Sequence, residues 1–171
     1  MDTVNRAFVK DPDDAGLPEQ LPERPQSPHP NYVTPAGLAH LKSLSAELLA
    51  RRDQLLDAGK LADPQELAVL QRDLRYYEER VSRAVPVDPT KQPTDRVAFG
   101  TTVEVRDEAG AVETYALVGE DEAEAALGLI SWVSPLAGAL LHAEVGDEVE
   151  WRRPAGMKRL EVLAIRSGPG G

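Results

Sequence analysis

The stretch Asp57-Ala-Gly-Lys-Leu-Ala-Asp-Pro-Gln-Glu66 decides the fold of the N-terminal half, because a helix stop signal is followed at once by a helix start signal. Gly59 suits the left-handed residue that follows the C-terminus of a helix. Asp63 can then cap a second helix, with Pro64 at its first position and Glu66 placed to complete a capping box. The stretch therefore predicts a tight turn between two helices.

Apolar residues recur with helical periodicity on both sides of this turn. On its N-terminal side, Thr34 is a good N-cap and Pro35 occupies the first helical position. Two such helices joined by a loop of about five residues must lie antiparallel, so residues 34–88 are predicted to form an antiparallel coiled-coil hairpin. The periodic positions are Leu38, Leu41, Leu44, Leu48 and Leu55 before the turn, and Leu67, Leu70, Leu74, Tyr77, Val81 and Ala84 after it.

The pattern beyond Asp88 is typical of β-structure. A polar, Pro-containing linker over 89–95 precedes short alternating runs that are separated by turn signals. We expect an α+β fold, in which a domain over 96–167 packs one main helix on a small antiparallel sheet. The expected strands are 101–106, 111–118, 130–133, 148–152 and 159–165, and the helix begins at Ser134-Pro135.

The two ends of the chain are polar. Residues 1–33 contain six prolines, six acidic and three basic residues, a composition that is typical of a flexible tail. The alternative is a docking arm whose best anchor is the short apolar patch Arg6-Ala-Phe-Val-Lys10. Residues 168–171 are expected to be a disordered tail.

The composition of the whole chain excludes several functions. The chain contains 19 Lys and Arg and 29 Asp and Glu, and the resulting net charge of −10 disfavours direct binding to duplex DNA. The absence of cysteine excludes disulfides, zinc ribbons and thiol nucleophiles, and the three histidines are scattered. We expect no metal site and no cofactor. No apolar run is long enough for a membrane span, and no signal peptide is evident. We therefore expect a cytoplasmic protein without membrane contact.

The C-terminal sequence resembles that of the Gre family of bacterial transcription factors. The resemblance rests on Val97-Ala-Phe-Gly-Thr-Thr-Val-Glu-Val, Tyr115-Ala-Leu-Val-Gly-Glu-Asp-Glu-Ala, Ile130-Ser-Trp-Val-Ser-Pro-Leu-Ala-Gly-Ala-Leu-Leu, Val145-Gly-Asp-Glu-Val and Pro154-Ala-Gly. These runs follow the family's order and spacing, and the match covers residues 32–167. It implies an FKBP-like C-terminal domain that docks at the secondary channel of RNA polymerase, with a coiled coil that reaches toward the active centre. Association with DNA and RNA would then be indirect.

The hairpin tip departs from the pattern of the cleavage-stimulating members, in which two acidic residues help to hold magnesium. Lys60 stands at the position of the first acid, and an ammonium group repels the metal that a carboxylate would recruit. Asp63 stands at the second position, and Pro64 replaces an asparagine. Asp57 or Glu66 could in principle rebuild a site with Asp63, although the capping box already accounts for Asp63 and Glu66.

The hairpin is also shorter than the resemblance leads us to expect. Each arm lacks about eight residues, which at 1.5 Å per residue leaves the tip short by roughly 12 Å. Loss of about a heptad from both arms keeps the antiparallel seam in register. The sequence therefore predicts a polymerase-binding regulator that does not stimulate transcript cleavage itself. The alternatives are a cleavage factor that uses Asp63 with Asp57 or Glu66, and a relative of the nucleoside diphosphate kinase regulator, which also has a shortened coiled coil.

Candidate docking residues lie in the segment that resembles the family's binding loop. We name Asp121, Glu122 and the helix start Ser134-Pro135-Leu136; a solvated loop is the alternative for the acidic run, and capping alone could explain Ser134. For two further sets of residues, both a structural role and contact with a partner are open. These are the strand tryptophans Trp132 and Trp151, and the basic surface of the second helix formed by Arg72, Arg75, Arg80 and Arg83.

No enzymatic activity is expected. The FKBP-like fold that the resemblance implies suggests a peptidyl-prolyl isomerase, but fold does not carry function. Such a pocket needs an aromatic floor, and the domain from Pro89 onward has few aromatic residues: Phe99, Tyr115, Trp132 and Trp151. Because the seam of the hairpin is satisfied within one chain, we expect a monomer.

Overall fold

The computed structural model describes residues 21–59 and 63–168. In these residues, each α-helix begins where a capping residue precedes a proline. Thr34 caps α1 (Pro35–Ala58) and accepts the Gly37 N–H at 3.0 Å. Asp63 caps α2 (Pro64–Ser82) through the N–H of Gln65 at 2.9 Å. Ser134 caps α3 (Pro135–Leu140). A side-chain oxygen thus satisfies one N–H that has no intrahelical partner, and these predicted helix starts are confirmed.

The predicted capping box of α2 is wrong. The Glu66 carboxylate does not return to the backbone of Asp63; it accepts hydrogen bonds from Arg51 Nε at 3.0 Å and from Arg51 Nη2 at 2.7 Å. A charged partner on the facing helix α1 offers two hydrogen bonds to one oxygen, and charge-assisted bonds are stronger than neutral ones. Glu66 therefore joins the two arms near the tip.

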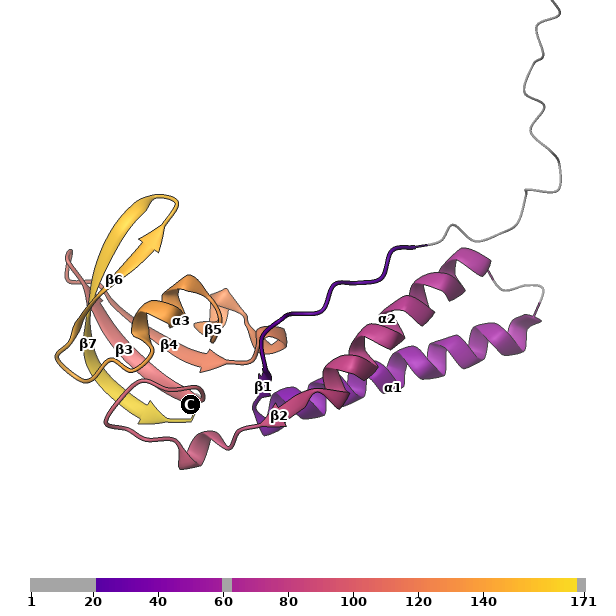
Figure 1. The fold of residues 1–171 in the computed structure, drawn as a ribbon, viewed down its shortest axis with the longest axis horizontal. Helices are drawn as coiled ribbons and strands as arrows, with labels where there is room; N and C mark the ends of the chain where they lie inside the picture. The colour runs from indigo at the N-terminus through magenta and orange to yellow at the C-terminus, as the bar shows by residue number, and fades with distance from the viewer. Residues whose placement is uncertain (1–20, 60–62, 169–171) are drawn as a thin grey trace, which may run out of the picture.

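Helices α1 and α2 form the expected antiparallel hairpin (Figure 1). Leu41 and Leu55 of α1 and Leu74 of α2 are its buried apolar residues. At the base of the hairpin, β1 (Asn31–Val33) pairs in parallel with β2 (Ala84–Pro86). This pairing brings together the segments that enter and leave the hairpin.

The expectation of a flexible tail up to residue 33 differs from the structure for residues 21–33. This segment lies along α2 and ends in β1, and it is hydrogen-bonded to α2 through Gln26 and Asn31. Hydrogen bonds to backbone carbonyls of a helix 49 and 50 positions away order a segment that has few apolar residues of its own. The expectations for residues 1–20 and for the end of the chain at 169–171 lie outside the described residues.

The β domain is a five-stranded sheet with the strand order β5-β4-β3-β7-β6, connected to the hairpin through η3 (Pro89–Lys91). It confirms the expected α+β class, but the sheet is mixed rather than antiparallel, because β5 pairs in parallel with β4. The connection between these two strands contains the turns η4 (Glu120–Glu122) and η5 (Ala125–Leu127). The strands are β3 (Thr101–Asp107), β4 (Val112–Val118), β5 (Leu129–Ser131), β6 (Glu148–Arg153) and β7 (Gly156–Ser167).

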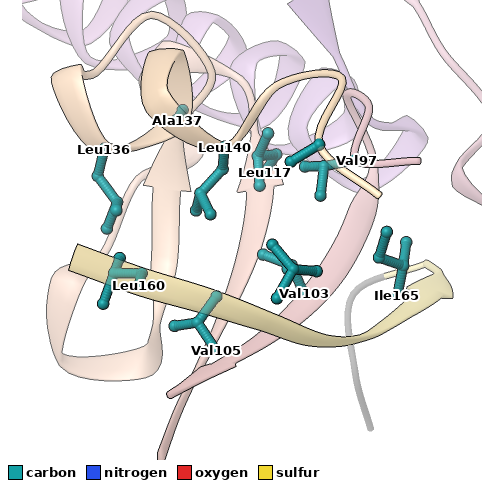
Figure 2. Packing of buried hydrophobic residues seen from close by; sticks show 11 residues of the cluster. Val97, Val103, Val105, Leu117, Leu136, Ala137, Leu140, Leu160 and Ile165 are labelled. Carbon is teal, nitrogen blue, oxygen red and sulfur yellow. The ribbon is translucent and has the colours of Figure 1, made fainter. Parts of the chain in front are cut away.

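The core of the β domain lies between α3 and the sheet (Figure 2). Leu136 and Leu140 of α3 point toward the side chains of β3, β4 and β7, and Ala137 belongs to the same buried cluster. This apolar burial is the main term that stabilises the domain. No helix in the described part of the chain is long and apolar enough to cross a membrane. The sheet residues of this core are Val103, Val105, Leu117, Leu160, Val162 and Ile165.

Candidate functional site

The acidic turn after β4 joins the β domain to the hairpin. Arg80 of α2 is only 1% exposed, and its Nε and Nη2 atoms donate to Asp121 Oδ2 at 2.8 and 2.5 Å. Glu120 lies 3.6 Å from the same guanidinium. A buried charge needs such a partner, because an unpaired one is costly to desolvate. This ion pair therefore fixes α2 against the β domain.

A second contact of the same turn involves the start of α1. The Glu122 carboxylate accepts hydrogen bonds from the N–H and hydroxyl of Thr34 and from the N–H of Gly119. A carboxylate is favoured at a helix N-terminus, where the helix dipole is positive. The carboxylate lies so close to Gly37 that a Cβ atom there would displace it from this position. We call Thr34, Arg80, Asp121 and Glu122 the joint.

The joint changes the interpretation of two candidate docking residues. Asp121 and Glu122 are engaged within the chain, so the acidic run is neither a free docking patch nor a solvated loop over these positions. The arginines of the basic surface expected on α2 also have partners within the chain. Arg80 is buried, Arg75 pairs with Glu23 at 2.5 Å, and Arg72 lies 2.9 Å from Asp73. Asp121 and Glu23 are distant in sequence from the arginines that they pair with, whereas Asp73 is the neighbour of Arg72.

An open apolar groove of about 900 Å³ lies on the surface of the β domain. Its lining comes from segments far apart in the sequence, which the sheet and α3 bring together. The volume is within the usual range for binding pockets, about 300–1,000 Å³. The lining residues are Glu113 and Tyr115 of β4, Ala123, Ala125, Leu129, Ile130 and Ser131 around β5, Ser134, Pro135 and Leu136 at the start of α3, and Trp151, Arg152, Arg153, Pro154 and Ala155 of the β6–β7 hairpin.

The groove combines an apolar wall with a few polar groups. The Arg153 guanidinium lies 5.3 Å from the centre of the Trp151 ring, and none of the described residues accepts a hydrogen bond from its buried Nε. Burial, with a hydrogen bond to Glu113, raises the pKa of Tyr115 to about 12. The phenol therefore stays neutral at physiological pH. The groove therefore presents an apolar wall with the Arg153 guanidinium and the Tyr115 phenol beside it.

The structure divides the five predicted docking residues between two places. Ser134, Pro135 and Leu136 line the groove, whereas Asp121 and Glu122 belong to the joint. Pro135 is exposed, and Leu136 is buried in the core. Ser134 also caps α3, so its structural role is accounted for.

The two tryptophans have different surroundings. Trp151 lines the groove and also packs on the core. Trp132 lies in the turn after β5, because this strand ends at Ser131, earlier than predicted. Its ring contacts His29 and Tyr32 at centroid distances of 6.0 and 5.0 Å. Sequence reasoning missed Arg152 and Arg153, two adjacent arginines at the end of β6 that no motif in the sequence singles out.

The described part of the hairpin tip has structural contacts of its own. Asp63 caps α2, and Glu66 is bonded to Arg51, so neither carboxylate is without a partner. Lys60 lies outside the described residues. Asp57 is exposed near the end of α1.

Comparisons with known proteins find relatives that match most of the chain. Residues 92–167 match the family model described as "Transcription elongation factor, GreA/GreB, C-term". Transcription elongation factor GreB of Neisseria meningitidis serogroup B is 33% identical over 151 residues, which covers 79% of this chain and 93% of that protein. Transcription elongation factor GreA of Nautilia profundicola is 39% identical over 137 residues, with 75% and 85% covered.

The chain belongs to the GreA/GreB family of transcription elongation factors, because these relatives are more than 30% identical to it over most of their length. Among solved structures, GreA factor homolog 1 (Gfh1) of Thermus thermophilus is similar, with 23% identity and a TM-score of 0.38. The match covers 81% of this chain and 100% of that one.

Proposed function

We propose that this chain binds RNA polymerase at the secondary channel, with the β domain docked through the apolar groove and the hairpin directed into the channel. We further propose that it does not stimulate transcript cleavage. In this account it regulates elongation by occupying the channel and has no catalytic activity of its own. The groove is the observation that carries the docking part of the proposal.

The composition of the groove supports docking of a protein partner. Protein interfaces are enriched in aromatic residues and arginine at their centres, and the groove contains Tyr115, Trp151 and Arg153. The guanidinium of Arg153 already lies over Trp151, so little conformational freedom is lost when it receives an acceptor. The groove is formed by residues within the segment that matches the family model, 92–167.

The contacts of the hairpin support the absence of cleavage stimulation. Glu66, one of the acids that could replace the missing tip carboxylate, is held by Arg51 through two hydrogen bonds. Asp63 is the cap of α2, and the Lys60 ammonium would repel magnesium. Helix α1 has 24 residues and α2 has 19; these arms span about 36 and 29 Å at 1.5 Å per residue. Arms of this length support a tip that stops above the catalytic centre of the polymerase.

Competition for polymerase tests the docking part of the proposal. A fluorescently labelled GreA is bound to core RNA polymerase, and this protein is added in increasing amounts. We expect displacement of the label, because two factors that enter one channel exclude each other. Unlabelled GreA is the positive control. A GreA signal that persists when this protein is in a hundredfold excess would contradict docking at that site.

A further inference from the structure

Residues 21–33, which we call the strap, lie along α2 and continue into the base of the hairpin (Figure 1). Asn31 Nδ2 donates to the carbonyl of Arg80 at 2.7 Å, and Gln26 Nε2 donates to the carbonyl of Tyr76 at 3.1 Å. Arg24 lies 3.5 Å from Asp73. The contacts thus follow α2 away from its base and toward the tip of the hairpin.

Three prolines of the strap, spaced three positions apart, share one exposed face. Pro22, Pro25 and Pro28 are exposed, whereas Arg24 and Ser27 are half-buried against the hairpin. An extended Pro-rich chain has three residues per turn, so residues three apart lie on one face. Prolines also restrict the unfolded chain, which lowers the entropy lost when the strap becomes ordered. The sequence pattern therefore favours a stiff, extended segment with one face toward α2.

Arg24 is the outermost strong contact of the strap on α2. Its guanidinium lies 3.9 Å from the ring centre of Tyr76 and 5.2 Å from that of Tyr77, in addition to the ion pair with Asp73. A cation over an aromatic ring is attracted to it, and two rings and a carboxylate on one helix hold the same side chain. Glu23 adds an ion pair with Arg75, but both side chains of that pair are more than half exposed.

The other end of the strap lies against the β domain. His29 and Tyr32 contact the ring of Trp132, and Tyr32 also lies 5.9 Å from the ring of Phe99. The strap therefore contacts α2 beyond the joint and the β domain at its other end. A connection at two separated points resists bending of the hairpin about the joint more than the joint does by itself.

We infer that the strap is a brace that fixes the direction of the hairpin relative to the groove. This inference rests on the proposed function, in which the groove and the hairpin meet the polymerase at the same time. A rigid relation between two binding parts avoids the entropic cost of ordering them during binding. Arg24 and Gln26 are then positioning residues for polymerase binding, although they lie outside the groove and the tip.

Distance distributions between two spin labels test the brace directly. The chain contains no cysteine, so Ala50→Cys on α1 and Ala111→Cys in the β3–β4 turn, both exposed, provide the only labelling sites. We expect a single narrow distribution in the otherwise unchanged chain, and at least a doubling of its width in the Arg24→Ala/Gln26→Ala variant. Glu23→Ala is the matched control, since it removes an exposed contact of the same strap; it should leave the width unchanged.

Polymerase affinity provides the second readout, measured on unlabelled chains whose circular dichroism shows that they are folded. The Arg24→Ala/Gln26→Ala variant should bind about tenfold more weakly than the parent, and Glu23→Ala should bind like the parent. An equal width in all three labelled chains would overturn the brace. Failure of the parent to bind polymerase would instead refute the proposed function, while the label distances would still decide whether the strap fixes the hairpin.

Discussion

Replacing Arg80 with alanine is expected to lower the free energy of unfolding by about 3–5 kcal/mol, because it removes one partner of a buried ion pair. Arg80 is almost fully buried, and it bonds Asp121 with Glu120 close by. Without the guanidinium, two carboxylates face each other at the joint without a cation. Chemical denaturation followed by circular dichroism measures the change.

Arg75→Ala is the control for this experiment, because it removes an arginine from the same helix. Its ion pair with Glu23 is exposed, with 55% and 64% of the two side chains accessible. Exposed pairs contribute about 0–1 kcal/mol, so this variant should unfold nearly like the parent. If Arg80→Ala costs no more than Arg75→Ala, the joint does not hold the two parts together as described.

Ala125→Glu should weaken binding to RNA polymerase by about 30- to 1,000-fold, which corresponds to the loss of about 2–4 kcal/mol at the centre of an interface. Ala125 is exposed in η5 and lines the groove. A carboxylate there would project into the groove and place a charge among apolar side chains. The competition experiment with labelled GreA measures the effect.

The neighbouring residue provides a closely matched control. Ala126 is exposed in the same helical turn but does not line the groove. Ala126→Glu carries the same change in charge and size, so it should compete like the parent chain. Equal competition by both variants would show that the partner docks elsewhere on the molecule.

Local signals in the sequence accounted for much of the fold. A capping side chain followed by proline marks each α-helix start because its hydrogen bond lies within three residues, as at Thr34 and Ser134. The β3–β4 hairpin follows from alternation around a short turn. The resemblance to the Gre family, based on runs in the β domain, is confirmed by the family model and by relatives that match over most of their length.

The features that the sequence did not predict depend on contacts between distant residues. Arg80 looked like one of several surface arginines because its partner Asp121 is 41 positions away. The strap looked like a tail because its few apolar residues say nothing about the carbonyls and rings of α2 that hold it. The groove is likewise assembled from segments between 113 and 155. Three of its residues, from Ser134 to Leu136, were predicted only through the resemblance.

We propose that this Gre-family chain enters the secondary channel without stimulating cleavage. The most direct measurement is RNA shortening in a stalled, backtracked elongation complex, under conditions in which the competition experiment shows that the chain is bound. Asp63→Asn is the informative variant, since asparagine also caps helices well and the substitution removes the charge without removing the cap.

We predict that neither the parent chain nor Asp63→Asn raises the rate of RNA shortening above the rate seen with polymerase alone. Added GreA should shorten the RNA, and an excess of the parent chain should suppress that shortening. Magnesium-dependent shortening by the parent chain that is lost in Asp63→Asn would contradict the account, because it would mean that the short hairpin delivers a working carboxylate to the active centre.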